Sequence, residues 1–208
     1  MTSKREVVEG WAKFLNPLTL RANLLTASIF LTAYESLMQC IVDQLQGFYC
    51  TGFDPDGLTY SDSYRRNVLA RHKEKLTASL LWFQESGAID QADIDLVDRI
   101  RKHRNEIAHE LWKFMATAKH NVDIKLIEEM CGLVVKIDRW WIRNIELDVN
   151  PDFDHMDKSA IPDDQIQSGR MIFLEMMIRI AAAEDDTTSL KFYHEVMAAV
   201  GEPVSVGE

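Results

Sequence analysis

The chain of 208 residues is long enough for one domain with a substantial core and short for two. Its 47% hydrophobic and 27% charged residues are typical of a globular protein and exclude a disordered chain. The formal net charge of -10 disfavours a protein that coats nucleic acid in general, because an acidic surface repels polyphosphate at long range.

The hydrophobic pattern predicts an all-α protein: a four- to five-helix bundle with an appended C-terminal helical hairpin. A short amphipathic helix over 5–15 comes first. Asn16 then caps a long helix that starts at Pro17 and runs to about Cys50. A turn-rich loop and a helix from about 64 to 86 follow, and no segment shows a strand pattern.

The second half of the chain is also expected to be helical. Asp90 is a suitable cap for a helix over about 91–114, and Asn121 for one over about 122–147. The latter contains Gly132, which costs about 1 kcal/mol inside a helix and often marks the close approach of another backbone. The predicted organisation is a bundle over 1–148, an acidic proline-containing linker over 149–163, and a hairpin over 164–208. The hairpin helices, near 164–183 and 188–200, are expected to pack on the same domain or on a dimer partner.

Charge is distributed unevenly along the chain. The residues from Glu146 to Glu208 include 14 acidic and 4 basic ones, so the whole acidic excess is C-terminal. Basic residues gather in two short stretches: 65–75 has five against one glutamate, and 99–104 has four and no acid. These patches are the parts of the surface suited to contact RNA.

Cysteine usage and hydropathy indicate a cytoplasmic protein. Cys40, Cys50 and Cys131 are odd in number and widely spaced, which favours reduced thiols over a disulfide framework or a zinc site. The N-terminal residues lack the apolar core of a signal peptide. The uncharged run between Arg21 and Glu35 is shorter than the about 20 apolar residues that span a membrane, so no membrane contact is expected.

The predicted helix over 91–114 has two distinct faces when its residues are placed at 100° intervals. The core face holds Leu96, Ile100, His103, Ile107 and Leu111. The opposite face is a polar ridge of Arg101, Asn105 and His109, with Arg104 on its flank. This ridge is either a solvated helix surface or a surface that meets another molecule, and His103 is expected to be a packed core residue.

The stretch from Arg104 to His109, RNEIAH, resembles the motif of the HEPN superfamily: an arginine, four to six further positions, and a histidine. Members of this superfamily are four- or five-helix bundles, and many are dimeric RNA-cleaving toxins. The resemblance covers about 18–147. A second match runs from Arg66 to His72. Some members carry a tyrosine two positions after the histidine, which a partner enzyme modifies; Leu111 stands there, so such regulation is not expected.

The resemblance implies a metal-independent endoribonuclease that acts as a homodimer. RNA carries its own nucleophile, the 2′-hydroxyl, so cleavage needs proton transfer and positive charge on the phosphate. His109 would transfer protons, Arg104 would bind the phosphate, and Asn105 would orient one or the other. Substrate contacts are expected from Arg101, Lys102, Arg66, Arg71 and His72. No metal or other cofactor and no DNA substrate are expected. A toxin or anti-phage setting, with an antitoxin or another protein partner, is implied by the resemblance alone.

Two other interpretations stay open. A non-catalytic protein-interaction module is favoured by the acidic C-terminal third, which suits a protein partner or a cover over the basic patches. A ferritin-like di-metal protein would use Glu106 and His109, which have the i, i+3 spacing of one half-site, but a second Glu-x-x-His is missing. Trp140 and Trp141 are expected at the core or an interface rather than under a nucleic-acid base.

Overall fold

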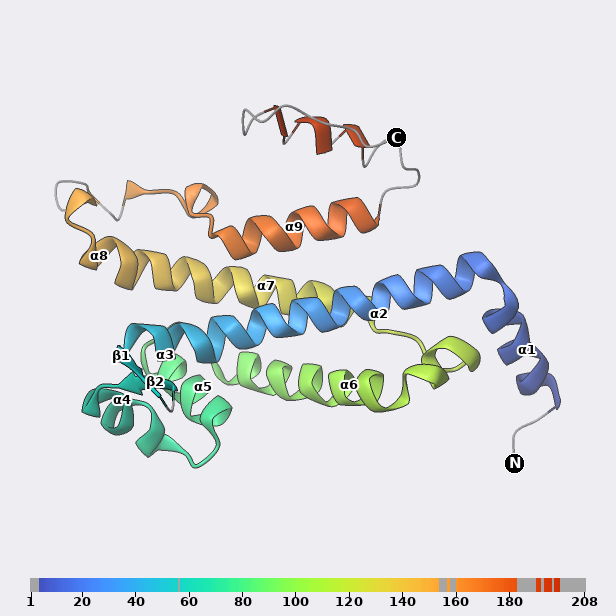
Figure 1. The fold of residues 1–208 in the computed structure, drawn as a ribbon, viewed down its shortest axis with the longest axis horizontal. Helices are drawn as coiled ribbons and strands as arrows, with labels where there is room; N and C mark the ends of the chain where they lie inside the picture. Colours follow the sequence, from blue (N-terminus) through green and yellow to red (C-terminus); the bar gives the residue numbers. More distant parts are fainter. Residues whose placement is uncertain are drawn as a thin grey trace.

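A computed structural model shows an all-α protein with one β-hairpin (Figure 1). It describes residues 4–55, 57–153, 157, 160–182, 190–191, 193–195 and 197–198. Three long helices, α2, α6 and α7, contact one another; α1 packs on α2 and α6, and α9 packs on α2 and α7. The bounds of the α-helices are α1 Lys4–Leu15, α2 Pro17–Met38, α3 Gln44–Phe48, α4 Asp62–Asn67, α5 Lys75–Glu85, α6 Gln91–Ala116, α7 Ile124–Trp141, α8 Leu147–Val149 and α9 Gly169–Ala181.

Short helical turns connect several of these elements. The π-helical turn η1 (Gln39–Asp43) joins α2 to α3, and η3 (Ile142–Glu146) joins α7 to α8. The 3-10 turns are η2 (Leu69–Arg71), η4 (Pro151–Phe153) and η6 (Asp163–Gln165). The central helical stretch therefore continues from Pro17 to Phe48, close to the predicted end.

The start of this central stretch confirms the predicted cap. The side-chain oxygen of Asn16 accepts hydrogen bonds from the backbone N–H groups of Leu18 (3.0 Å) and Thr19 (3.4 Å). Pro17 occupies the first turn, where a missing N–H does no harm. A polar cap and a proline are local signals, so the sequence alone located this helix start.

The expectation that 51–63 lacks strands was wrong. Strands β1 (Cys50–Asp54) and β2 (Gly57–Tyr60) form an antiparallel hairpin in which Phe53 pairs with Leu58. Gly57 has a φ of 124°, a conformation that side chains with a Cβ rarely adopt. Turn-forming residues dominate this stretch and obscure two strands that are only five and four residues long.

The predicted continuous helix over 64–86 is broken in the structure. The break lies between α4 and α5, where η2 forms and the backbone of His72 becomes extended, with φ -159° and ψ 152°. Val68 is fully buried at this point. Packing of Val68 in the core overrides the helical propensity of the segment. The resulting break brings the residues before α5 against α6.

The fourth helix begins later than predicted. The cap of α7 is Asp123, whose carboxylate accepts a hydrogen bond from the N–H of Leu126 at 3.1 Å. Asn121 instead accepts a hydrogen bond from Lys13. The predicted cap of α6 is confirmed, because Asp90 and Asp93 form a reciprocal capping box.

The C-terminal region begins its helix at Gly169, capped by Ser168, rather than near 164. Leu174 of α9 is buried in the main core. Of the second predicted hairpin helix, over 188–200, the structure describes residues 190–191, 193–195 and 197–198, and these are helical.

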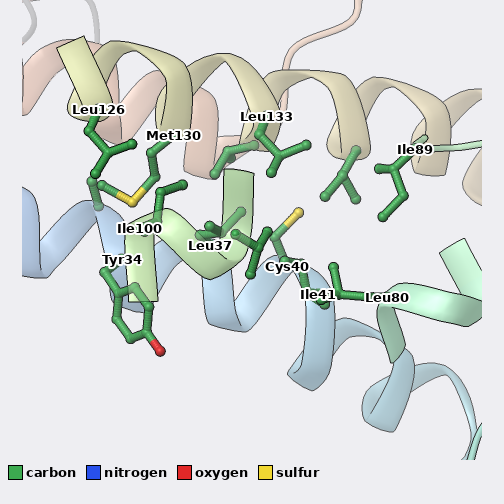
Figure 2. Packing of buried hydrophobic residues seen from close by; sticks show 14 of the residues in the cluster. Tyr34, Leu37, Cys40, Ile41, Leu80, Ile89, Ile100, Leu126, Met130 and Leu133 are labelled. Carbon is green, nitrogen blue, oxygen red and sulfur yellow. The ribbon is translucent and has the colours of Figure 1, made fainter. Parts of the chain in front are cut away.

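The core is formed by side chains of α2, η1, α5, α6 and α7 (Figure 2). Its largest fully buried members are Tyr64, Phe30, Phe83, Phe114, Leu37, Ile41, Leu45, Ile100, Ile107, Met130, Ile137 and Val68. Burying one such aliphatic side chain contributes about 1.5–3 kcal/mol. The thiols of all three cysteines are free, and burial raises the pKa of Cys40 well above its usual value.

The stretch from Pro17 to Phe48 is apolar and long enough, by length and composition, to cross a membrane. The uncharged run between Arg21 and Glu35, on which the expectation of no membrane span was based, is only part of this apolar stretch. In the structure it packs against α6 and α7, and the core helix of a water-soluble protein has the same composition.

Gly10 of α1 packs closely against the C-terminal end of α6. A Cβ atom there would lie 2.4 Å from the carbonyl oxygen of Ala116. We therefore expect Gly10→Ala to lower the free energy of unfolding, measured by urea denaturation, by about 1–3 kcal/mol. Gly47→Ala is the control, because its Cβ would meet nothing within 4 Å and alanine favours a helix by up to about 1 kcal/mol. Equal stability of the two variants would contradict the close contact of α1 with α6.

Candidate functional site

Helix α6 positions the residues of the RNEIAH motif. Ile100 and Ile107 are buried on its inner side, while Asn105 and His109 are exposed and Arg101 is half-buried. The polar ridge thus faces outward, as the helical period predicts.

The helix is distorted immediately after the motif. Glu110 has a φ of -128° and a ψ of 29°, so the regular helix is interrupted after His109. The prediction that Leu111 lies on the core face was wrong, because Leu111 is 38% exposed. Beyond the distortion Phe114 and Met115 are buried instead, since the interruption changes which residues face inward.

Arg104 crosses the surface of α2. Its guanidinium carbon lies 5.2 Å from the centre of the Tyr34 ring, and its Nη2 lies 3.6 Å from a carboxylate oxygen of Glu35. Its Nη1 donates a 3.5 Å hydrogen bond to the side-chain oxygen of Asn105, and its Nε is buried without a partner. The guanidinium is therefore held in place while part of its donor capacity is unused.

The aromatic ring of Tyr34 lies beneath the guanidinium of Arg104. Figure 2 shows its ring pointing away from the side chains of α7. Burial raises the pKa of the Tyr34 hydroxyl, and the charges of Arg104 and Arg101 partly offset this shift. The hydroxyl is therefore neutral at physiological pH, so Tyr34 supports Arg104 through its ring and does not act as a base.

The segment before α5 reaches the same part of α6. Arg101 forms an ion pair with Glu74 at 2.8 Å. The N–H of Glu74 donates to Nδ1 of His72 at 3.0 Å. His72, from the second RNxxxxH match, is thus brought next to the ridge through Glu74.

A second titratable cluster lies at the end of α6, starting one residue beyond His109. Lys113 hydrogen-bonds Glu110 at 2.5 Å and is the main reason that the pKa of Glu110 lies below its usual value. The charges of His120 and His109 act in the same direction. Two imidazoles therefore lie near one carboxylate.

His120 was not identified from the sequence as a site residue. Its Nδ1 lies 2.8 Å from Oγ1 of Thr117, and its carbonyl accepts a 2.6 Å hydrogen bond from Lys13 of α1. Lys13 also binds the carbonyl of Thr117 and the side chain of Asn121. Lys13 of α1, about 100 residues earlier in the chain, thus holds this loop in place. No local pattern in the sequence therefore identifies His120 as a site residue.

The remaining residues predicted to contact the substrate are Lys102, Arg66 and Arg71. Lys102 and Arg66 are exposed. Arg71 is committed to Glu85 by an ion pair at 2.5 Å. Arg66 and Arg71 thus lie in the segment around α4 and η2, away from the end of α6 where His109 lies (Figure 1).

His103 has a structural role, as expected. Its Nε2 accepts a hydrogen bond from the N–H of Asp123 at 3.0 Å, and its ring packs edge-on against Phe30 and Phe114. It therefore joins α6 to the start of α7 rather than facing a ligand.

Within one chain, Arg104 and His109 form neither a hydrogen bond nor an ion pair with each other in the described part of the structure. Five helical positions separate their directions by about 140°. The two halves of the motif thus point to different sides of α6, and joining them at one phosphate requires a second surface.

Among the residues that the structure describes, no group of three or more His, Cys, Asp and Glu side chains gathers closely enough to hold an ion. The described arrangement offers Arg101 and Arg104 as anion-binding groups, and His109 and His120 for proton transfer. In comparisons with known proteins, no family model, no curated sequence and no solved structure matches this chain.

Proposed function

We propose that this protein is a metal-independent endoribonuclease of HEPN toxin type that cleaves RNA in a site shared by two subunits. His109 transfers protons to and from the reacting oxygens, and Arg104 binds the phosphate that becomes more negatively charged in the transition state. Asn105, hydrogen-bonded to Arg104, orients the guanidinium. The 2′-hydroxyl of the substrate is the nucleophile.

The environment of Arg104 is the observation that carries this proposal. An arginine held over an aromatic ring, with only a weak 3.6 Å acidic contact at its Nη2, is prepared to bind an anion. Arg101 places a second guanidinium near Tyr34, with its charge paired to Glu74 at 2.8 Å. A purely solvated helix face does not require a partly buried guanidinium.

The proposal of a shared site rests on the different directions in which Arg104 and His109 point from α6. A two-fold axis that brings two copies of α6 together places the arginine of one copy near the histidine of the other. If the axis passes through the site, the single cleft contains both copies of His109 and both copies of Arg104, enough for a base, an acid and charge neutralisation.

The chemistry of the products tests this proposal. We expect the purified protein to cut single-stranded RNA in EDTA and to leave 2′,3′-cyclic phosphate ends, because attack by the 2′-hydroxyl needs no metal. Mass spectrometry of the fragments identifies these ends. The matched control is the same oligonucleotide with a 2′-deoxy sugar at the cleaved position, which should stay intact. Cleavage of the deoxy substrate, or no cleavage of any RNA, would contradict the proposal.

A second candidate function is a protein-interaction module, and one surface favours it. A groove of about 420 Å³ between α1 and the end of α6 has a mostly apolar lining that includes Val7, Trp11, Phe14 and Trp112. Trp11 is 59% exposed and Trp112 63% exposed. Exposed tryptophans grouped in one groove are typical of a protein contact, such as a second copy or an antitoxin.

A further inference from the structure

The C-terminal half of α7 carries a groove that the proposed ribonuclease site does not use. The groove has a volume of about 450 Å³ and lies between α7, η3, the start of the α5–α6 loop and η6. Figure 1 shows this part of α7 at the end of the molecule that carries the β-hairpin, opposite to the end where α6 meets α1. Its volume is within the range of about 300–1,000 Å³ that is typical of small-ligand sites.

Three cations of one helical face border this groove: Lys136, Arg139 and Arg143. Lys136 is paired with Asp93 at 2.5 Å, and Arg143 with Asp163 at 2.7 Å. These acids hold the two outer cations in place and offset their charge.

Arg139 lies between these two cations and differs from both. Its Nε donates a long 3.5 Å hydrogen bond to the carbonyl of Ile166. Within the described residues no carboxylate forms an ion pair with it. A half-buried guanidinium whose Nη groups are unpaired offers a forked donor for a phosphate group.

Gly132 lines the groove, and its presence in the middle of helix α7 needs an explanation. Glycine inside a helix destabilises it by about 1 kcal/mol relative to alanine. The expectation that another backbone approaches Gly132 closely was wrong, because a Cβ added there would meet nothing within 4 Å. The absent side chain instead leaves open space along the groove, one helical turn from Lys136 and two turns from Arg139.

Trp140 supplies an aromatic wall. It is half-buried, whereas the neighbouring Trp141 is a core residue that is 4% exposed. The ring of Trp140 packs edge-on against Trp82 and Phe83, each with a centroid distance of 6.1 Å. An indole fixed in this way beside an arginine combines a stacking surface with a phosphate-binding group.

We propose that this groove binds a nucleoside monophosphate, with the phosphate on Arg139 and the base against Trp140. Lys136 and Arg143, each already paired with an aspartate, border the groove on either side. The groove along α7, which the missing side chain of Gly132 keeps open, has room for the nucleotide. This site is separate from the ribonuclease site and does not depend on it.

Isothermal titration calorimetry of the full chain with AMP and GMP tests this proposal. We expect at least one of them to bind at one site per chain with a dissociation constant of about 1 mM or tighter. Adenosine, guanosine and inorganic phosphate should each bind at least about tenfold more weakly, because each lacks one of the two recognised groups. No binding of either nucleotide, or equally tight binding of inorganic phosphate, would overturn the proposal.

Variants locate the site within the molecule. Arg139→Gln should weaken nucleotide binding by about tenfold or more, and Arg21→Gln, at an exposed arginine of α2, should leave it unchanged. Gly132→Phe should block the groove, while Gly132→Ala should retain binding and raise stability slightly. Circular dichroism confirms that each variant is folded. Unchanged affinity in both Arg139→Gln and Gly132→Phe would overturn the proposal, and neither result depends on RNA cleavage.

Discussion

Replacing His109 with alanine is expected to slow RNA cleavage by about 10²–10⁴-fold, because this range is the usual contribution of a positioned acid or base. His109 is exposed at the end of the regular part of α6 and makes no core contact. The variant should therefore unfold at the same urea concentration as the parent. Initial rates on a fluorescent RNA substrate measure the effect.

The controls for this variant separate catalysis from general damage. His194→Ala removes another exposed imidazole far along the chain and should leave the rate unchanged. His120→Ala should lower the rate less than His109→Ala, since His120 lies in the loop that follows α6. A His109→Ala protein that cleaves RNA as fast as the parent would end the proposed role of this residue.

Mixing experiments test whether two subunits share one cleft. If each cleft needs both copies of His109, equal amounts of parent and His109→Ala chains, allowed to exchange subunits, should show about one quarter of the parental activity. Independent sites in each chain would show about one half.

Replacing Arg170 with methionine is expected to produce the largest loss of stability, about 3–5 kcal/mol. Arg170 of α9 pairs with Asp138 of α7 at 2.9 Å, and Asp138 is only 2% exposed. Ser168 and Cys40 also hydrogen-bond this carboxylate. Removing the arginine leaves a buried negative charge without its counter-charge, which weakens the packing of α9 on the bundle.

Urea denaturation measures this loss, and two further variants interpret it. Arg179→Met removes an exposed i, i+4 ion pair of the same helix and should change stability by less than about 1 kcal/mol. Combining Arg170→Met with Asp138→Leu should recover much of the lost stability, because the buried charge is then absent. A single Arg170→Met variant as stable as the parent would show that Asp138 is not effectively buried.

The sequence predicted those features that depend on neighbouring residues. The capping signals at Asn16 and Asp90 located helix starts, and the helical period placed Asn105 and His109 on an outward face. Capping and period act within one or two turns, so the chain itself specifies them. The hydrophobic pattern likewise predicted an all-α protein, which the structure confirms.

Only the tertiary structure decided which distant groups meet. It placed Arg104 over Tyr34, brought His120 close to Glu110, and left open space above Gly132. It also broke the helix predicted over 64–86 where Val68 enters the core. Each of these outcomes depends on packing between segments far apart in the chain. Such contacts leave no periodic signal in either segment, because their energy depends on the partner.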